Sequence, residues 1–137
     1  MIIVVDANIA AALFLDLAYS AQARDAVMEA SGIIAPDLIT AEVANTLSKL
    51  VRFKHIDMGL ADHVLDGLTA IISEFVPGAR LAVEAVKHAS ALGHPAYDCF
   101  YLTLARRRRA KLITADRRFA AALERVDPPV DYKLIAA

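Results

Sequence analysis

The chain has 137 residues, the length of a single domain with its own hydrophobic core. Its apolar content of 58% excludes a disordered chain, and its net charge of −1 neither favours nor excludes a nucleic-acid partner. No uncharged run approaches the roughly 18 residues that span a bilayer, and a single cysteine, Cys99, excludes an internal disulfide. We therefore expect one cytoplasmic domain over residues 1–137, without a membrane span or a signal peptide.

Short apolar runs alternate with helical patterns along the whole chain. The first run, residues 2–5, is β-branched and suits a strand buried on both faces. Asp6 then opens an apolar helix that is expected to continue to about residue 16. The remaining strands are predicted at residues 33–35, 73–76, 111–114 and 132–135. The remaining helices are predicted at about residues 20–30, 38–51, 57–72, 79–92, 96–108 and 116–124.

Several helix ends carry recognisable signals. Gly32 is expected to be the C-cap of the second helix. Either Asp37 or Thr40 is expected to cap the start of the third. Gly-His-Pro at residues 93–95 breaks the chain between two further helices.

The alternation of strands and helices predicts the fold class. Helical crossovers between strands favour an α/β domain with a mainly parallel sheet. Ligands of such sheets bind at the carboxyl ends of the strands. Asp6 follows the first predicted strand and Asp116 the fourth, so the topology should bring both carboxylates to this edge.

Two further acids, Glu42 and Asp98, lie in predicted helices next to apolar residues. A carboxylate beside a buried segment is costly unless it is paired, solvated or bound to a metal. Together with Asp6 and Asp116, these acids would form a strongly anionic cleft that a divalent cation relieves. Magnesium is commonly held by a few carboxylates plus phosphate oxygens, and paired metal ions promote in-line displacement at phosphorus. The set therefore predicts metal-assisted phosphodiester chemistry.

Each acid taken singly has a structural alternative. Asp98 and Asp116 are equally consistent with helix N-caps, and Glu42 with an ordinary exposed helical residue. Asp6 is the hardest to explain structurally, because a carboxylate directly after a buried strand has few structural roles. Only the set of four predicts function.

Two polar residues are candidates for supporting this site. Asn8, two residues after Asp6, is placed to contact substrate, a water or a neighbouring carboxylate. Thr114, two residues before Asp116, is expected to orient that acid from behind.

Basic residues gather next to Asp116, between Leu104 and Arg118. They are Arg106, Arg107, Arg108, Arg109, Lys111, Arg117 and Arg118. Residues 106–109 point around the whole helix, so most of them are interpreted as a solvated last turn that complements the helix dipole. One or two of them are expected to contact a polyanion.

Other common site chemistries lack their sequence signals. The four histidines and Cys99 do not have a zinc-binding spacing, and most of the histidines are expected at the surface or as caps. The chain has neither a Gly-x-Ser-x-Gly elbow nor a glycine-rich phosphate loop. Cys99 is expected to be a small buried residue.

The acidic segments together resemble the PIN-domain ribonucleases, and the length and motif order resemble the toxins of the VapC type. The resemblance lies in Ile-Val-Val-Asp-Ala-Asn at residues 3–8, the helix with Glu42, Tyr-Asp at residues 97–98, and Leu-Ile-Thr-Ala-Asp-Arg-Arg-Phe at residues 112–119. It covers essentially the whole chain. Asn8 stands where many members have serine or threonine, a departure that leaves metal binding intact.

The resemblance implies a three-layer α/β/α fold and an endoribonuclease that depends on Mg²⁺ or Mn²⁺. Asp6, Glu42, Asp98 and Asp116 match the acidic catalytic set, with Asp6, Asp98 and Asp116 assigned to the metal. Arg117 and Arg118 are assigned to RNA binding.

The resemblance also implies a homodimer and a cognate antitoxin that blocks the acidic pocket. Candidate contacts, each equally consistent with a place in the core, are Leu47, Leu50, Val51, Met58 and Leu60.

Four other functions are conceivable for such a chain. A PIN-type nuclease of RNA processing or quality control, without a toxin role, cannot be separated from a toxin by sequence. A phosphoacceptor receiver domain needs an acidic pair after the first strand and an Asp after the third, but Ala7-Asn8 follow Asp6 and Pro77 follows Val76. The same Ala7-Asn8 departs from the Asp-x-Asp of haloacid-type phosphatases. A PIN domain that only binds is disfavoured because all four acids are present.

Overall fold

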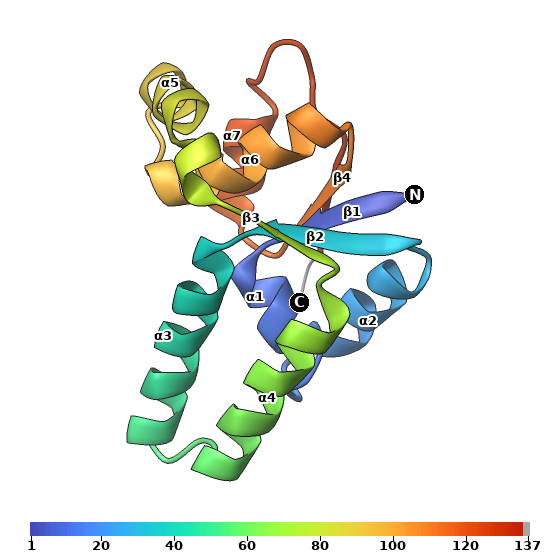
Figure 1. Cartoon of the computed structure of the whole chain (residues 1–137), viewed down its shortest axis with the longest axis vertical. Helices are drawn as coiled ribbons and strands as arrows, with labels where there is room; N and C mark the ends of the chain where they lie inside the picture. The colour runs from blue at the N-terminus through green and yellow to red at the C-terminus, as the bar shows by residue number, and fades with distance from the viewer. Residues whose placement is uncertain (136–137) are drawn as a thin grey trace.

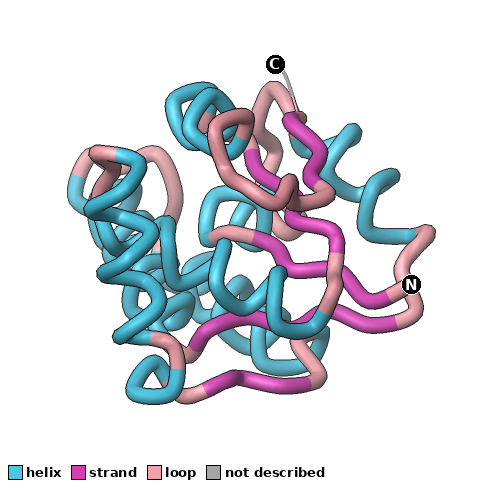
Figure 2. Tube along the Cα trace, turned by 90° about the horizontal axis from the view of Figure 1, so that it is seen from above, coloured by secondary structure: helices cyan, strands magenta, loops and turns pink. Residues whose placement is uncertain are grey.

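The computed structural model describes residues 1–135 and contains, in that range, one parallel sheet of five strands. The strands are β1 (Ile2–Val5), β2 (Gly32–Pro36), β3 (Glu74–Val76), β4 (Lys111–Thr114) and β5 (Tyr132–Leu134). Their order across the sheet is β3-β2-β1-β4-β5, and every neighbouring pair is parallel. Figure 2 shows the strands side by side in a twisted sheet with helices around them. The predicted parallel α/β sheet is therefore confirmed.

Helices cover both faces of this sheet. They are α1 (Ala7–Ala12), α2 (Ser20–Met28), α3 (Leu38–Arg52), α4 (Met58–Ile71), α5 (Ala82–Leu92), α6 (Ala96–Arg108) and α7 (Arg117–Leu123), with a 3-10 turn η1 (Gly78–Arg80) before α5. Helices α1 to α4 lie on one side of the sheet and α5 to α7 on the other (Figure 1). The expected three-layer α/β/α architecture is thus confirmed. None of the helices in the described part of the chain is long and apolar enough to cross a membrane.

The chain winds outward from β1 in two directions. It first adds β2 and β3 on one side, through α1 to α4, and then returns through α5 and α6 to add β4 on the other side of β1. The winding therefore reverses between β1 and β4. In parallel sheets such a reversal leaves a crevice at the carboxyl ends of the two strands, because the connections that follow them diverge to opposite faces.

Apart from their first residues, strands β1 and β4 are buried, which fixes the position of the residues that follow them. Ile3, Val4, Val5 and Leu112 are each at most 1% exposed. Helix α6 packs on β1, β2 and β4 and is itself buried along its middle, from Tyr101 to Ala105. Asp6, Asp98 and Asp116 are attached to this rigid centre.

The predicted first helix, residues 6–16, is too long. It ends at Ala12, with Leu13 as its C-cap. The guanidinium of Arg24 donates from Nε to the Leu13 carbonyl at 3.1 Å and from Nη2 to the Leu15 carbonyl at 2.8 Å. These contacts from α2 hold the chain in the non-helical segment that follows Ala12.

One predicted cap is wrong, and another is right in position but makes no capping hydrogen bond. Gly32 does not cap α2, whose C-cap is Glu29, but begins β2, because its backbone pairs with Ile2 of β1. Asp37 stands at the start of α3 but makes no capping bond, since its Oδ1 accepts from the Gly78 N–H at 3.0 Å. The other strands and helices lie within a few residues of their predicted ends.

Candidate active site

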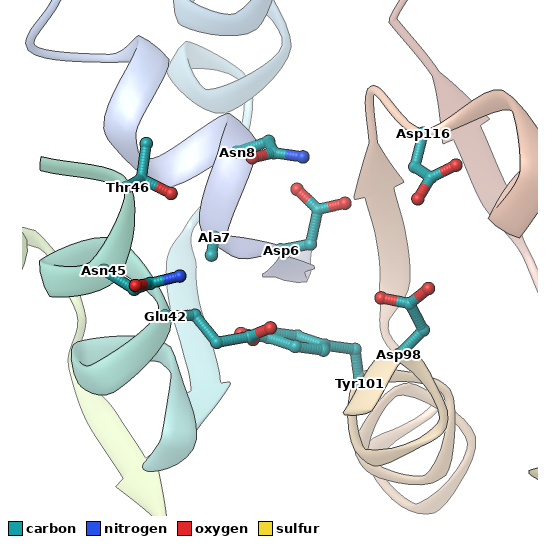
Figure 3. A pocket seen from close by; sticks show the side chains of 9 residues that line it. All are labelled: Asp6, Ala7, Asn8, Glu42, Asn45, Thr46, Asp98, Tyr101 and Asp116. Atoms are coloured by element: carbon teal, nitrogen blue, oxygen red, sulfur yellow. The ribbon is translucent and has the colours of Figure 1, made fainter. Parts of the chain in front are cut away.

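A pocket of about 140 Å³ opens at the carboxyl ends of β1 and β4, where the winding reverses. It is lined by Asp6, Ala7, Asn8, Glu42, Asn45, Thr46, Asp98, Tyr101 and Asp116. Figure 3 shows Asp6, Asp98 and Asp116 on one side of this space and Asn45 and Thr46 across from them on α3. The structure therefore brings together all four acids that the sequence singled out, and Asn8 with them.

Asp6 is held at the centre of the site by local backbone geometry. It is the N-cap of α1, and its Oδ1 accepts from the Ile9 N–H at 3.0 Å. Its Oδ2 accepts from the hydroxyl of Thr114, the last residue of β4. Asp6 is only 5% exposed.

Burial dominates the protonation of Asp6. It raises the pKa of the carboxyl from 3.8 to about 7, against the opposing effect of the hydrogen bonds from Thr114 and Ile9. The negative charges of Asp98 and Asp116 raise the pKa further. The folded protein thus holds an acid whose ionised form is disfavoured, a common property of functional carboxylates.

Thr114 joins the two acids that follow the central strands. Its hydroxyl donates to Asp6 and accepts from the Asp116 N–H at 3.0 Å. Asp116 in turn caps α7, with Oδ1 accepting from the N–H groups of Arg118 at 2.9 Å and Phe119 at 3.1 Å. Thr114 was expected to orient the Asp116 carboxylate, but its side chain contacts Asp116 only through the backbone and orients Asp6 instead.

Asp98 lies in the first turn of α6 and is not its N-cap, which is Pro95. Its Oδ2 lies 2.6 Å from Nε2 of His94. Burial raises the pKa of Asp98 and the Asp116 charge adds to this, whereas the hydrogen bond and charge of His94 oppose it. His94, whose side chain is 8% exposed, is an exception to the expectation that most of the histidines lie at the surface or act as caps.

Glu42 points into the pocket from α3 and is half-buried (Figure 3). Its Oε1 accepts from the hydroxyl of Tyr101 at 2.6 Å. Burial is the main cause that raises the pKa of Glu42, the Asp98 charge adds to it, and the Tyr101 bond opposes it. The alternative of an ordinary exposed helical residue is therefore wrong for Glu42.

Sequence reasoning missed Asn45, Thr46, Tyr101 and His94 at this site. Asn45 and Thr46 follow Glu42 by three and four residues, the spacing that puts side chains on one helical face, so the helix period could have found them. His94 precedes Asp98 by four residues but lies before the start of α6. The helix period therefore could not predict that the two side chains meet. Tyr101 has no local signal, because its partner Glu42 is 59 residues away in sequence.

The pocket has the donor atoms that a hard divalent cation requires. Carboxylate oxygens are the preferred ligands of Mg²⁺, and a cluster of acids with raised pKa values is stabilised by a cation. Within residues 1–135, no three His, Cys, Asp or Glu side chains are arranged so that they could hold an ion as they stand. Each acid instead accepts a hydrogen bond from the protein. A carboxylate has lone pairs on both oxygens, so it can keep a protein donor and still offer an oxygen to an ion.

The basic residues are divided between two environments. Arg107 and Arg108 on the last turn of α6 bind Glu84 and Glu74, each at 2.6 Å. Arg117 and Arg118 are exposed at the start of α7, directly after Asp116. The interpretation of the α6 run as a solvated last turn thus agrees with the structure for Arg107 and Arg108.

The apolar residues proposed as partner contacts also divide. Leu47 is 2% exposed and belongs to the core, so it cannot contribute a surface contact. Leu50, Val51 and Leu60 are partly buried against the core, whereas Met58 is 66% exposed.

The chain matches the PIN domain family over residues 3–124. It is 36% identical to Ribonuclease VapC3 of Pyrobaculum aerophilum over 126 residues, which cover 88% of this chain and 93% of that protein.

Two solved structures share the fold. The crystal structure of PAE2754 from Pyrobaculum aerophilum has a TM-score of 0.70 and 22% identity, and the match covers 96% of this chain and 92% of that one. The structure of VapBC2 from Rickettsia felis, bound to a DNA fragment from their promoter, gives a TM-score of 0.65 and 15% identity, with 98% of each chain covered. With the family match and the similar ribonuclease, these findings confirm the resemblance seen in the acidic segments: the chain belongs to the PIN domain family.

Proposed function

We propose that this chain is a divalent-metal-dependent endoribonuclease and the toxin of a toxin–antitoxin pair. The observation that carries the proposal is the meeting of Asp6, Glu42, Asp98 and Asp116, from four separate segments, around one pocket at the reversal point of the sheet. Similarity to a ribonuclease named VapC3 over nearly the whole chain supports the same activity.

Asp6, Asp98 and Asp116 are the residues that would hold Mg²⁺ or Mn²⁺. When bound, the ion supplies Lewis acidity for the scissile phosphate and the attacking water. In the described structure the three carboxylates are not yet close enough together to hold an ion. They would approach one another around the ion, and each could keep its protein donor, because a carboxylate has further lone pairs to offer. RNA is itself anionic, so a pocket of ionised acids repels it until a cation is bound.

Glu42 is the proposed general base. Its Oε1 is bound by Tyr101, which leaves Oε2 as the atom that would accept a proton. Its raised pKa moves it toward the operating pH, where a base is most effective.

The polar residues around the acids are proposed to bind RNA. Asn8, Asn45 and Thr46 line the pocket with amide and hydroxyl groups that suit phosphate or base edges. Arg117 and Arg118, exposed next to Asp116, are proposed to contact the RNA backbone beyond the pocket.

The toxin part of the proposal includes a cognate antitoxin and a homodimer. An anionic pocket with no arginine or lysine among its lining residues suits a basic side chain from an inhibitor, because such a side chain forms charge-assisted hydrogen bonds with carboxylates. Met58 is the exposed member of the apolar set and is retained as a candidate partner contact.

The test of activity uses purified protein and a long single-stranded RNA. We expect cleavage in Mg²⁺ or Mn²⁺, none after chelation, and none for Asp98→Asn at unchanged thermal stability. RNA cut equally fast in chelator would contradict the metal-dependent mechanism.

The test of the toxin role is expression in cells. The chain should arrest growth when expressed alone and not when its neighbouring gene is expressed with it. An active nuclease that leaves growth unchanged would favour a role in RNA processing instead.

A further inference from the structure

His94 is the residue of the site that the sequence did not predict and that the proposed chemistry does not use. Its Nε2 lies 2.6 Å from Oδ2 of Asp98. Its ring stacks on Phe119, with the ring centroids 5.4 Å apart and the planes at 21°. The side chain is 8% exposed and Phe119 is fully buried, so the imidazole lies largely within the protein interior.

The turn before α6 explains why His94 reaches Asp98. Gly93 ends α5 in the left-handed conformation, at φ +60, and Pro95 is the N-cap of α6. Asp98 is the third residue of α6, where an acid commonly reaches back to the N–H of the N-cap residue. Proline has no N–H. The nearest local donor to Asp98 is therefore the His94 ring rather than the backbone.

The same ring connects two of the acids. Phe119, on which it stacks, donates its N–H to Oδ1 of Asp116 at 3.1 Å. A continuous path of contacts thus runs from Asp98 through His94 and Phe119 to Asp116. These two carboxylates repel one another, because the charge of Asp116 acts on Asp98.

We propose that His94 is a positioning residue that fixes Asp98 relative to Asp116 for binding of a divalent cation. A carboxylate only accepts, so Nε2 carries the hydrogen and donates to Oδ2. Figure 3 shows one Asp98 oxygen directed toward the centre of the pocket. His94 holds the side chain in this orientation and does not itself enter the pocket lining. This inference rests on the proposed metal-dependent function.

Three substitutions separate the hydrogen bond from the packing. His94→Gln keeps an amide donor near the position of Nε2 but loses the stacked ring. His94→Phe keeps a ring against Phe119 but cannot donate. His94→Ala removes both and measures the combined effect. Thermal unfolding of each variant shows whether it is folded at the assay temperature.

The principal measurement is Mn²⁺ affinity by titration calorimetry, which needs no RNA. Partners that orient metal ligands typically contribute about 10-fold to 100-fold in metal affinity. We expect His94→Phe and His94→Ala to lose affinity in that range, and His94→Gln to recover at least about half of the loss on a logarithmic scale. Cleavage assays should show the loss for His94→Phe as an increased metal requirement, with KM for RNA little changed.

The outcomes distinguish this proposal from the proposed function. Weak binding by His94→Phe with recovery in His94→Gln supports the role of His94, even if the parent binds Mn²⁺ and fails to cut RNA. Parental affinity in a folded His94→Phe would overturn the role of His94 while leaving the ribonuclease proposal intact. Equal loss in all three variants would also overturn it, in favour of packing alone. A parent protein that takes up no Mn²⁺ would overturn both proposals.

Discussion

Carboxylates in the pocket and carboxylates at the outer edge of α6 have pKa values shifted in opposite directions. On the outer edge, Glu74 and Glu84 are bound by Arg108 and Arg107, and these arginines lower the pKa of each acid. In the pocket, burial and mutual repulsion raise the pKa of Asp6, Glu42 and Asp98.

The ionised form is favoured in the folded state for the carboxylates on the outer edge and disfavoured for those in the pocket. Exposed ion pairs contribute little, typically below about 1 kcal/mol, but they satisfy both partners. Among residues 1–135, no arginine or lysine forms an ion pair with any of the four pocket acids, although Arg117 and Arg118 directly follow Asp116. Clusters of carboxylates with raised pKa values are typical of functional sites, and the ligand proposed for this one is a divalent cation.

The largest expected effect comes from removing a pocket acid, with an acid outside the pocket as its control. Asp6→Asn should reduce RNA cleavage by more than about 100-fold, since residues that merely orient metal ligands already contribute about 10-fold to 100-fold. Glu74→Gln removes a carboxylate outside the pocket and should leave the rate unchanged. Initial rates at saturating Mn²⁺ test the pair, and comparable rates for the two variants would remove Asp6 from the site.

The second prediction concerns stability and its pH dependence. The pKa of Asp6 is about 7 in the folded chain against an ordinary value of 3.8, so the folded state binds more protons between these values and stability falls as pH rises through this window. The shift sets a ceiling on the order of 4 kcal/mol for the cost of ionising Asp6. Asp6→Asn should therefore unfold at a higher temperature than the parent at pH 8, by a few degrees, with a smaller difference at about pH 4.5.

Glu74→Gln is the control for this measurement, because the pKa shift of Glu74 has the opposite direction. The pKa of Glu74 is lowered by Arg108, so its charge favours folding at neutral pH and its removal should bring no gain. A lower unfolding temperature for Asp6→Asn than for the parent at pH 8 would show that the ionised Asp6 carboxylate does not destabilise the folded state.

The third prediction tests the partner of Glu42. Tyr101→Phe removes the hydroxyl that donates to Oε1 and leaves the ring in the core. We expect a loss of about 10-fold in kcat, as for other groups that orient site residues, and about 1 kcal/mol in the free energy of unfolding. An unchanged kcat with the same destabilisation would make Tyr101 a structural residue only.

The smallest expected effect concerns the arginines. Replacing both Arg117 and Arg118 with alanine should weaken RNA binding a few-fold and reduce the slope of log affinity against log salt by about 0.7 for each phosphate that is no longer neutralised. The matched control replaces Arg107 and Arg108, which are bound to Glu84 and Glu74. If the control changed the slope as much as the Arg117 and Arg118 variant, RNA would lie along α6 instead.

Much of the fold could be predicted because its elements are locally encoded. The strand at Lys111–Thr114 was predicted with its observed ends, since an apolar run between a charged turn and Asp116 leaves little choice. The helix after Asp6 was predicted too long, and the segment that follows its actual end is held by Arg24, whose guanidinium donates to the carbonyls of Leu13 and Leu15. Contacts of this kind depend on the folded chain and have no signal in the local sequence.

The site residues also divide into those that local sequence predicts and those that depend on contacts in the folded chain. Asp6 and Asp116 could be placed from topology alone, since both follow neighbouring parallel strands. Glu42 was predicted only as a member of the set of four acids, since taken alone it suited an exposed helical residue, and the structure then supplied its partner Tyr101. His94 was missed because its role depends on the side-chain rotamer and on a stack with Phe119, 25 residues further along the chain.

The central claim is that these acids jointly bind a divalent cation, and crystals soaked in Mn²⁺ test it most directly through anomalous scattering. We predict a peak in the pocket, coordinated by carboxylate oxygens of Asp6, Asp98 and Asp116, that disappears in Asp6→Asn. Crystals that show no manganese among these side chains at millimolar Mn²⁺, or show it only at acids elsewhere on the surface, would contradict the account.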